Sequence, residues 1–488
     1  MSLFLQDFSQ LSTVVPLLVV TSITLWLLVP PTKKKNDDDG IPTVPGAVPL
    51  LGHALAYKKN PPQFLADAFD KYGPIIRINL AGKNMVVFGR DCPDLRQVMS
   101  APEKLVSARD AVQEVGFEET LGYLNISQGA DIHKHLLKSA FLTPTKLQEH
   151  LNQVYTGLQD ALRIELSEYQ SSSIDFMKFM RRVMLRVSIT QLIGESFWKH
   201  VVGKAFISNY VQFQDLLEDA TAQAAVLPRW MALPLCLWGV QRRRLVLQKE
   251  LKRILHALDG ETNGIGVWLQ EIRNENKYSL DEMAELIVGL LFAAHKNAAI
   301  GAAQSYLLLR GDDSPRNDIE ICLKEALYVA KNHNKVLSAQ PLVKSCPQIN
   351  KVCREALRVT AHTIGALRTL REPLVLKDSG MRLEKGTTIA VSHIAPHLDQ
   401  TVWQSAAFNT SAHDDQLYRD PYRFTTFSHG THVCPGQGLA LALIQSTMIQ
   451  LLAEYEVTLP KKIPSLCFER ATLAQRRAPV VVTIVSKR

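Results

Sequence analysis

This chain has no CxxC pair, no long linker rich in glycine, serine and proline, and no internal repeat. Its seven cysteines are odd in number and scattered along the sequence, which argues against a disulfide framework and for reduced thiols in the cytosol. Because no linker or repeat divides the 488 residues, and 46% of them are hydrophobic, they can fill one large core. We therefore expect a single large domain.

Concentrated charge of one sign is also scarce. The formal net charge is +8, but the basic residues are dispersed, and no aromatic residues alternate with them in a loop or strand. A nucleic-acid partner would need a basic patch or stripe with such aromatic residues. We therefore expect no nucleic-acid partner, only a solvated basic face.

One long hydrophobic run is present near the start of the chain. Residues 11–29 form a mostly apolar stretch of 19 residues without charge, about the length that a helix needs to cross the hydrocarbon layer. A cleaved signal peptide is the alternative, but residues 1–10 contain an aspartate and no Lys or Arg. Three lysines at 33–35 place the rest of the chain in the cytosol by the positive-inside rule. We expect a single-pass membrane anchor over residues 1–32, a basic and proline-rich hinge over 33–53, and the large domain over 54–488.

Helical patterns dominate the large domain. A capping box of Ser279 and Glu282 begins a long central helix that ends near Gly311, and further helices are expected at 349–359 and 437–455. Strands are few. A hairpin is expected at 75–80 and 85–88, and strand-like segments occur at 374–376, 388–391 and 480–485. The fold class is therefore mainly α with small β-sheets (α+β).

The most informative motif is residues 427–436, Phe-Ser-His-Gly-Thr-His-Val-Cys-Pro-Gly. It places Cys434 in a loop bounded by Gly430 and Gly436, directly before a helical pattern. Unpaired N–H groups at a helix N-terminus favour thiolate over thiol, and glycines let a large planar ligand approach the backbone. The motif therefore indicates a thiolate metal ligand. A buried cysteine at a helix start is the alternative reading.

This segment resembles the haem-binding loop of the cytochrome P450 superfamily, with Phe427 and Gly436 at its two ends. Glu355 and Arg358 are similar to the family's Glu-x-x-Arg pair, and Arg423 is the expected third member of that brace. The resemblance implies the family's triangular fold, preceded here by one transmembrane helix. It also implies haem b as the cofactor, with Cys434 as the axial ligand of the iron.

The resemblance also implies residues that hold the haem propionates. His432 matches a position usually held by His or Arg, and Arg368 resembles an arginine that commonly binds a propionate. In a segment similar to the family's Trp-x-x-x-Arg helix, Ala130 replaces the Trp and Lys134 replaces the Arg. The compact ammonium of a lysine therefore replaces the planar guanidinium of an arginine there, and Lys134 remains a candidate haem contact.

On the central helix, the family usually carries an acid followed by Thr or Ser, which help deliver protons during oxygen activation. This chain has Lys296 and Asn297 in those places, and an amide can orient a water but cannot titrate. Asn297 resembles the asparagine of prostacyclin synthase, an isomerase, and of sterol 7α-hydroxylases, which consume oxygen. Lys296 either pairs with a substrate carboxylate or haem propionate, or is an exposed lysine pointing away from the haem. Both residues are the catalytic candidates.

The resemblance implies a membrane-bound monooxygenase of the endoplasmic reticulum that oxidises a bulky lipophilic molecule, such as a terpenoid, sterol or polyketide of secondary metabolism. Its expected electron donor is an acidic, NADPH-dependent flavoprotein reductase. The alternatives are a haem-thiolate isomerase or dehydratase that needs no external electrons, and a haem-binding protein without turnover. Residues expected to touch the membrane are Trp230, Trp238 and 242–244, and those expected to line the substrate cavity are Phe117, Leu121, Tyr123, Ala293, Ala294 and 363–366.

Overall fold

The chain was analysed as a computed structural model, in which residues 41–488 form one compact unit, distinct from residues 1–40. Within that unit, Thr43 pairs with Arg77, and the Val44 N–H donates to the Arg77 carbonyl at 3.0 Å. The later part of the expected hinge is therefore joined to the first strand, β1 (Ile75–Leu80). The predicted anchor and Lys134 lie outside the described residues. These are 39–49, 51–127, 132, 143–169, 173–194, 203–224, 229–257, 264–275, 277–311, 315–411, 416–470 and 472–487.

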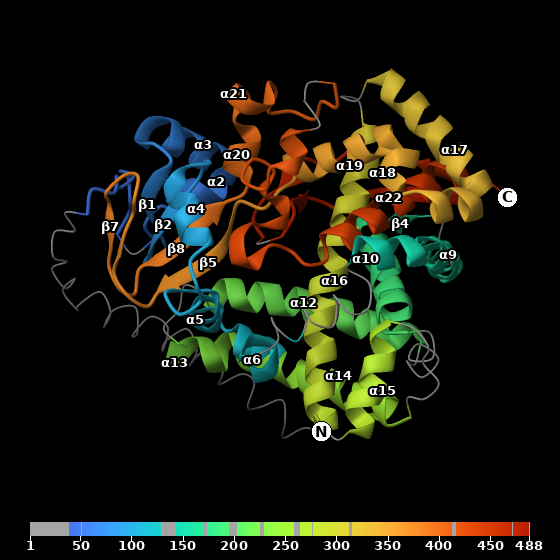
Figure 1. The fold of residues 1–488 in the computed structure, drawn as a ribbon, viewed down its shortest axis with the longest axis horizontal. Helices are drawn as coiled ribbons and strands as arrows, with labels where there is room; N and C mark the ends of the chain where they lie inside the picture. Colours follow the sequence, from blue (N-terminus) through green and yellow to red (C-terminus); the bar gives the residue numbers. More distant parts are fainter. Residues whose placement is uncertain are drawn as a thin grey trace, which may run out of the picture. The chain divides into compact units, whose positions relative to one another are not determined.

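Helices make up most of the compact unit, and α16 (Leu280–Leu309) runs through its middle (Figure 1). The predicted capping box is confirmed, because the Ser279 hydroxyl accepts from the Glu282 N–H at 3.2 Å while the Glu282 carboxylate accepts from the Ser279 N–H at 2.8 Å. The helices are α2 (Ala54–Lys59), α3 (Pro61–Tyr72), α4 (Pro93–Met99), α5 (Ala108–Glu114), α6 (Phe117–Leu121), α7 (Tyr123–Ser127), α9 (Pro144–Ser167), α10 (Phe176–Val187), η1 (Ser188–Ile193), α12 (Gly203–Ala224), α13 (Arg229–Ala232), η2 (Leu233–Leu237), α14 (Trp238–Ala257), α15 (Gly264–Asn274), α16, α17 (Arg316–Ala339), α18 (Leu342–Ser345), α19 (Pro347–Val359), α20 (Ile394–Leu398), α21 (Gln400–Trp403), η3 (Leu417–Arg419), η4 (Thr425–Phe427), η5 (Gly430–His432) and α22 (Gln437–Glu454).

The sheets are small, as expected. The largest has the order β1-β2-β8-β5-β3, with β2 and β8 parallel and the other pairs antiparallel. The predicted hairpin is confirmed, with β2 beginning at Lys83 and therefore with a tighter turn than expected. The strands are β1, β2 (Lys83–Phe88), β3 (Val106–Ser107), β4 (Ile174–Asp175), β5 (Ile364–Leu370), β6 (Leu374–Val375), β7 (Arg382–Leu383), β8 (Thr388–Ser392), β9 (Tyr455–Thr458), β10 (Leu466–Cys467), β11 (Gln475–Arg476) and β12 (Val481–Ser486).

Helix α16 belongs to two hydrophobic cores. Its N-terminal half, as far as Leu291, packs with residues of α12 and α14. Its C-terminal half, from Ala298 onward, packs with residues of α9, α10, α17, α19 and α22. Burial of apolar side chains in both cores holds the helix at each end, so the short stretch between Leu291 and Ala298 is presented in a fixed place.

The same helix is also long and apolar enough to span a membrane, although 78% of its most apolar window is buried inside the unit. It is therefore read as the central helix of the core.

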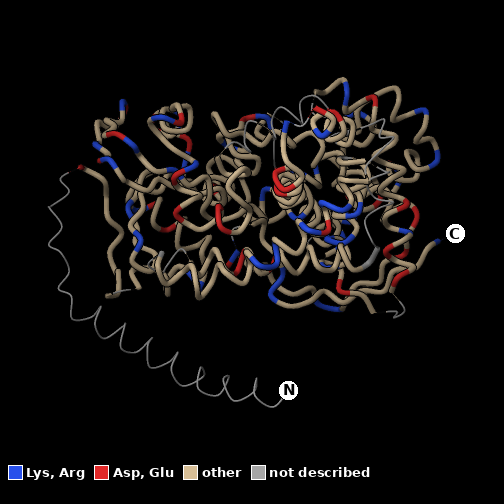
Figure 2. Tube along the Cα trace, turned by 90° about the horizontal axis from the view of Figure 1, so that it is seen from below, with Lys and Arg blue, Asp and Glu red and all other residues tan. Residues whose placement is uncertain are grey.

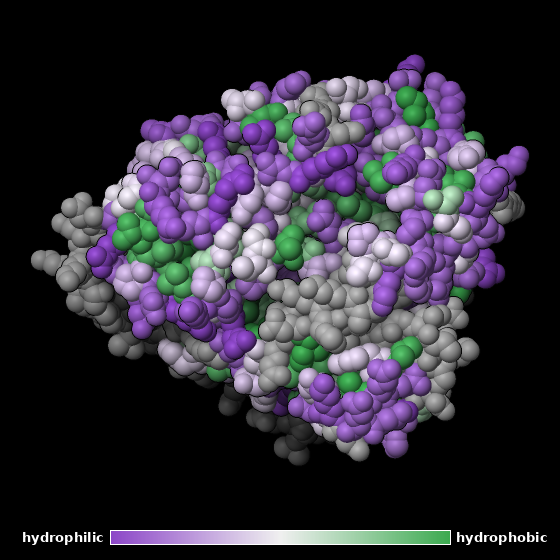
Figure 3. Space-filling model, in the orientation of Figure 1, coloured by the Kyte–Doolittle hydropathy of each residue, from purple (hydrophilic) through white to green (hydrophobic). Residues whose placement is uncertain are grey.

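Over the described chain, Lys and Arg are interspersed with Asp and Glu (Figure 2), in agreement with the dispersed charge of the sequence. On the face shown in Figure 3, hydrophilic residues predominate, and apolar ones form small separate groups.

Candidate haem-binding and active site

The loop before α22 presents Cys434. Its backbone N–H donates to the Phe427 carbonyl at 2.8 Å, which closes the loop between η4 and the helix. Gly430 has φ +68°, and a Cβ there would lie 2.0 Å from the Met99 carbonyl oxygen. Only glycine therefore fits at this turn. Helix α22 begins at Gln437, as the sequence predicted.

The Cys434 thiol is subject to two opposing effects. Burial raises its pKa, and a hydrogen bond from the backbone N–H of Gly436 lowers it. The net shift is upward, so the expectation that the helix start alone favours thiolate is outweighed by burial. Coordination of a metal ion deprotonates a thiol outright, which leaves the iron itself as the agent that would ionise this ligand.

Glu355 and Arg358 form a fully buried ion pair on α19, each with 0% of its surface exposed. Arg358 Nε donates to Glu355 Oε2 at 2.7 Å and Arg358 Nη2 to Oε1 at 2.6 Å. The carboxylate also accepts from the Tyr418 hydroxyl and from the Asn409 N–H, both at 2.8 Å. A buried pair is stable only when its remaining hydrogen-bonding groups are satisfied in this way.

The prediction that Arg423 completes this brace was wrong. Arg423 is about half exposed, and its guanidinium lies 3.6 Å from Asp420 instead. Tyr418 takes the third place with a neutral hydroxyl. A second arginine would have added a charge to a carboxylate whose charge Arg358 already balances.

A histidine joins the brace to the cysteine loop. His397 Nε2 accepts from the backbone N–H of Thr425 at 2.8 Å, so its proton is on Nδ1, which donates to the Arg358 carbonyl at 2.9 Å. Burial lowers the pKa of His397 to about 3, which keeps the ring neutral. His393 adds a second link, because its Nδ1 lies 2.9 Å from the Thr425 carbonyl.

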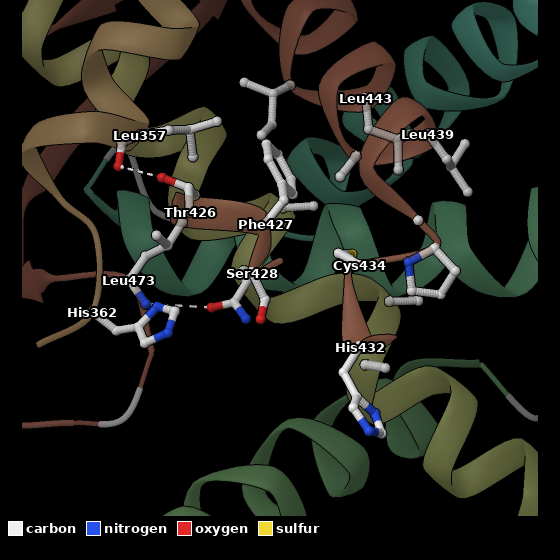
Figure 4. Close-up of a pocket in the computed structure, with 18 of the residues that line it drawn as sticks. Leu357, His362, Thr426, Phe427, Ser428, His432, Cys434, Leu439, Leu443 and Leu473 are labelled. Carbon is white, nitrogen blue, oxygen red and sulfur yellow. Dashed lines mark hydrogen bonds between the residues drawn. The ribbon is translucent and has the colours of Figure 1, made fainter. Parts of the chain in front are cut away.

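A cavity of about 290 Å³ lies between the cysteine loop and α16. Figure 4 shows Cys434 and His432 together, with Phe427, Thr426 and Leu473 elsewhere on the wall. Ala293 and Ala294 line the cavity as predicted, whereas the other predicted lining residues are absent from the described wall. The lining is Leu290, Ala293, Ala294, Asn297, Ala298, Leu357, His362, Thr426, Phe427, Ser428, His432, Cys434, Pro435, Gly436, Leu439, Ala440, Leu443, Ile444 and Leu473.

The predicted lining residues outside this wall have other roles. Phe117 packs edge-on against Phe292, with ring centroids 6.0 Å apart. Tyr123 is 62% exposed. His362, which directly precedes the expected segment 363–366, was missed, because the sequence does not say where strand β5 begins relative to the cavity. The signal available was an imidazole in an otherwise apolar stretch.

Asn297 faces the cavity, and its side-chain Oδ1 accepts from the backbone N–H of Leu473 at 3.4 Å. A backbone N–H can only donate, so the side-chain atom of Asn297 that faces Leu473 must be the amide oxygen and not the amide nitrogen. The amide N–H₂ group is therefore the end left for a ligand or water. The predicted placement of Asn297 at the centre of α16 agrees with this geometry, and its catalytic role remains a prediction.

Lys296 does not line the cavity. It is 1% exposed, and its ammonium pairs with Glu218 at 2.5 Å and with Asp215 at 3.3 Å, both on α12. Burial lowers its pKa, while Glu218 raises it. The second sequence alternative is right that the lysine points away from the cavity, but wrong that it is exposed, because it is buried and paired with α12. Adjacent positions on a helix diverge by about 100°, so Lys296 points to α12 while Asn297 points to the cavity.

Two candidates for anion binding lie close to the cysteine loop. His432 lines the cavity, and its Nε2 lies 3.3 Å from Glu103 Oε2. Arg368 on β5 is 5% exposed, and its Nη1 donates to the carbonyl of the adjacent Leu367 at 2.8 Å. Burial lowers the pKa of Arg368, and the Glu103 charge raises it. Among the described residues Arg368 has no ion pair within 4 Å, so this buried cation can take an anionic partner.

Comparison with known proteins gives the chain its family. The family model described as Cytochrome P450 matches residues 42–484. The chain belongs to the cytochrome P450 family. It is 22% identical to lanosterol 14-alpha demethylase of Bos taurus over 86% of this chain and 82% of that protein. It is 23% identical to cytochrome P450 82A2 of Glycine max over 93% and 92%, and 22% identical to cytochrome P450 monooxygenase 71 of Postia placenta over 87% and 88%.

This P450 is therefore an oxidoreductase of the monooxygenase type whose cofactor is haem, with the iron bound by a cysteine thiolate. The residues present fit that group. A single thiol reaches a mainly apolar cavity, an imidazole of the same loop also lines it, and Arg368, a buried arginine without an acidic partner among the described residues, lies near the loop outside the cavity wall. No group of three or more His, Cys, Asp or Glu side chains in the described chain could hold an ion instead.

Proposed function

We propose that this P450 is a membrane-bound monooxygenase of the endoplasmic reticulum that oxidises a bulky, lipophilic small molecule, a terpenoid, sterol or polyketide of secondary metabolism. The observation that carries the proposal is the wall of the cavity, in which Leu, Ala, Ile and Phe supply 11 of the 19 lining residues and no described residue is Asp, Glu, Lys or Arg. Burial of apolar ligand surface is the main source of affinity in such a site.

Two surface features support the membrane assignment. Trp230 and Trp238 are 71% and 53% exposed, and the guanidinium of Arg242 lies 3.9 Å over the Trp238 ring. Exposed tryptophans next to cations are typical of surfaces that meet lipid headgroups. Arg244, expected on the same surface, is instead 7% exposed and pairs with Glu285 at 3.1 Å. The apolar stretch at 11–29 is proposed as the anchor.

The proposed electron donor is an NADPH-dependent flavoprotein reductase that meets the face around the cysteine loop. Val433, beside the ligand, is 43% exposed, so a partner can approach this loop from solvent. The sterol-acting relative is consistent with a lipophilic substrate, since lanosterol 14-alpha demethylase of Bos taurus is similar along 86% of this chain.

Residues of the cysteine loop and residues of α16 have different proposed roles. Cys434 is proposed to bind the haem iron, with Phe427 and Gly436 shaping its loop, and Arg368 and His432 are proposed to hold the propionates. A bound thiolate-ligated haem supplies oxygen activation. Ala293 and Ala294 leave room for substrate, and the Asn297 amide is proposed to orient water there, because Leu473 fixes its oxygen. Lys296 has no proposed direct contact with haem or substrate.

The test is to incubate the purified holoenzyme with a mixture of terpenoids, sterols and polyketides under two conditions. One is anaerobic without electrons, and the other supplies oxygen, a flavoprotein reductase and NADPH. Product only under the second condition is the expected result. Cys434→Ser, measured in parallel, should give no product because the activating ligand is lost.

Two results would contradict the proposal. Product formed anaerobically without electrons would indicate a haem-thiolate isomerase or dehydratase, the reaction class that a non-titrating Asn297 also suits. Haem that stays bound while neither condition yields product would indicate a haem-binding protein without turnover. Mass spectrometry that detects one added oxygen atom per product molecule separates insertion from rearrangement, which leaves the molecular mass unchanged.

A further inference from the structure

The cavity wall contains polar groups that could recognise a substrate, one of which, His362, has no role in the proposed reaction. Most of the lining is apolar, and no described lining residue is Asp, Glu, Lys or Arg. The one lysine next to it in sequence, Lys296, is turned to α12 and neutralised there. A charged substrate group would therefore enter the cavity without a counter-charge, at a large cost in desolvation.

His362 is the unexplained polar group. It lines the cavity, and among the described residues it has no hydrogen-bond partner. Burial lowers the pKa of its imidazole to about 4, so the ring is neutral and offers one donor and one acceptor. Figure 4 shows His362 well separated from Cys434 and His432, at the other side of the view.

The His362 ring is packed closely by its neighbours. It packs on His393, with ring centroids 4.1 Å apart, and His393 is itself tied to the Thr425 carbonyl. A Cβ at Gly365 would lie 2.7 Å from His362 Nε2. The absence of a side chain at 365 therefore makes room for the ring. A positioned group of this kind loses little conformational entropy when it binds a ligand.

Asn297 is the second positioned polar group. Its Oδ1 is used by the Leu473 N–H, so the amide N–H₂ group is the free end on the same cavity. Among the other polar lining residues, the Thr426 hydroxyl donates to the Leu357 carbonyl, His432 lies beside Glu103, and Ser428 belongs to the cysteine loop. The wall therefore offers one amide donor and one neutral imidazole away from that loop. Such sparse polar groups in an apolar cavity fix the orientation of a ligand and set its specificity.

We propose that His362 and Asn297 are specificity-determining residues that recognise an uncharged oxygen function, a hydroxyl or a ketone, on an otherwise hydrocarbon substrate. The inference deepens the proposed function and depends on it. The substrate class is then a lipophilic molecule that already carries oxygen, and the reaction that supplies it is an earlier oxygenation, or a cyclisation that leaves an alcohol or ketone.

The test uses matched probes with the holoenzyme. Two sets are titrated, adamantane with adamantanol and adamantanone, and androstane with androstanol and androstanone, and dissociation constants are measured from the change in the haem absorption spectrum. We expect at least one oxygenated probe to bind about 5–10-fold more tightly than its parent hydrocarbon, the effect of one hydrogen bond to a buried site. Trimethyladamantylammonium should bind most weakly.

Variants assign the effect to residues. His362→Leu and Asn297→Leu should each reduce the preference without weakening hydrocarbon binding, and His362→Gln, which keeps a donor and an acceptor, should retain part of it. His256→Leu is the control, because His256 is an exposed histidine in the last turn of α14. If His362→Leu does not fold, the Gln and Asn297 variants still carry the test.

Several outcomes overturn the inference. Equal affinities within both probe sets would do so, as would the absence of binding by every oxygenated probe, or an unchanged preference in the variants. Loss of haem from His362→Leu, with no change in preference, would place the ring on the cofactor. A failure of the proposed function is distinguishable, because it appears as anaerobic product or no product in the turnover assay, whatever the probes bind.

Discussion

Ionisation of Cys434 depends on its surroundings more than on its place at a helix start. Burial raises the pKa of the thiol more than the Gly436 N–H lowers it. Cys434 would therefore give up its proton on binding a metal, and the only group in the described loop that lowers its pKa is the Gly436 N–H. The hydroxyl of serine is a much weaker acid than a thiol, so it cannot take over this role.

For this reason we expect Cys434→Ser to lose the absorption spectrum of thiolate-ligated haem and the carbon monoxide difference band of the reduced protein. Haem content, measured as the pyridine complex, should also fall. Cys467→Ser, at a half-buried cysteine on β10, is the matched control and should keep both signals. A thiolate-type spectrum that persists in Cys434→Ser would exclude Cys434 as the ligand.

A second residue-scale prediction concerns Asn297→Thr. Threonine introduces a hydroxyl but lacks the amide oxygen that accepts from Leu473, so a water held by the amide would be reorganised. We expect the ratio of product formed to NADPH consumed to change by severalfold, since positioned proton-transfer groups affect rates strongly. Peroxide release, measured with a peroxidase assay, should change in the opposite direction. Unchanged coupling would remove Asn297 from the mechanism.

These residues also show what the sequence could reveal. Cys434 and Ser279 were predictable because their signals are local, a glycine-bounded loop and a capping box. The third member of the brace was not, because Tyr418 is brought to Glu355 by tertiary packing from 63 residues away. His362 was missed for the same reason, since the sequence around a histidine does not show which cavity its side chain will face in the folded protein.

At the scale of elements, α16 is tied to α12 by charges. Lys296 meets Asp215 and Glu218, which lie 81 and 78 residues earlier in the chain. The apolar pattern predicted the helix but could not predict this contact, because the pairing depends on how α12 crosses α16. Arg181 of α10 also pairs with Asp215 at 2.9 Å, so three helices share one charge cluster, in which Lys296 is buried and the Asp215 side chain is 35% exposed.

Removal of the lysine should therefore destabilise the contact between α12 and α16. We expect Lys296→Met to lower the free energy of unfolding by about 3 kcal/mol, the range found when one partner of a buried pair is removed. Lys252→Met is the control, because Lys252 pairs with Asp281 at 2.7 Å in an exposed position and should cost under about 1 kcal/mol. Urea unfolding followed by circular dichroism gives both values.

Reversal of the pair gives a further check on the same contact. Glu218→Lys alone should be strongly destabilising, because it places two ammonium groups together, and Lys296→Glu in the same chain should recover part of the loss. The recovery is incomplete, because Arg181 and Asp215 stay as they are. A double variant no more stable than the worse single variant would show that the two charges do not interact.

At the scale of the whole molecule, the protein holds a group of buried neutral histidines. Burial lowers the pKa of His362 and His429 to about 4 and that of His295 and His397 to about 3. His393 is lowered as well. In the unfolded chain each has an ordinary value of 6.5. Several elements of the fold, from α16 to the cysteine loop, therefore share one sensitivity to acid.

The sign of the pH dependence follows from these shifts. Between pH 6.5 and about 4 the unfolded chain binds protons that the folded protein does not, so stability is fully present above 6.5 and falls as pH falls towards 4. We expect a loss on the order of 1–2 kcal/mol per histidine between pH 7 and 5. Glu218 and Glu325, whose pKa values burial raises, act in the opposite direction. Urea midpoints at several pH values give the slope.

His429→Phe should make that slope shallower. Both ring nitrogens of His429 are buried without a hydrogen-bond partner among the described residues, so the substitution removes an unsatisfied polar ring and one contributor to the acid sensitivity. Stability at pH 7 should not fall. His256→Phe, at an exposed site, should leave the slope unchanged, and an equal slope in His429→Phe would contradict the account.

The single ring of His397 has a consequence for protein engineering. His397 of α20 links the Arg358 carbonyl of α19 to the Thr425 N–H just before the cysteine loop. The geometry of the loop therefore depends on hydrogen bonds to residues outside it. Transfer of residues 427–436 alone into another protein would include Cys434 but not the hydrogen bonds from α19 and α20 that support the loop. Such a graft would have to include α19 and α20 as well, or supply an equivalent ring, before the loop could hold its geometry.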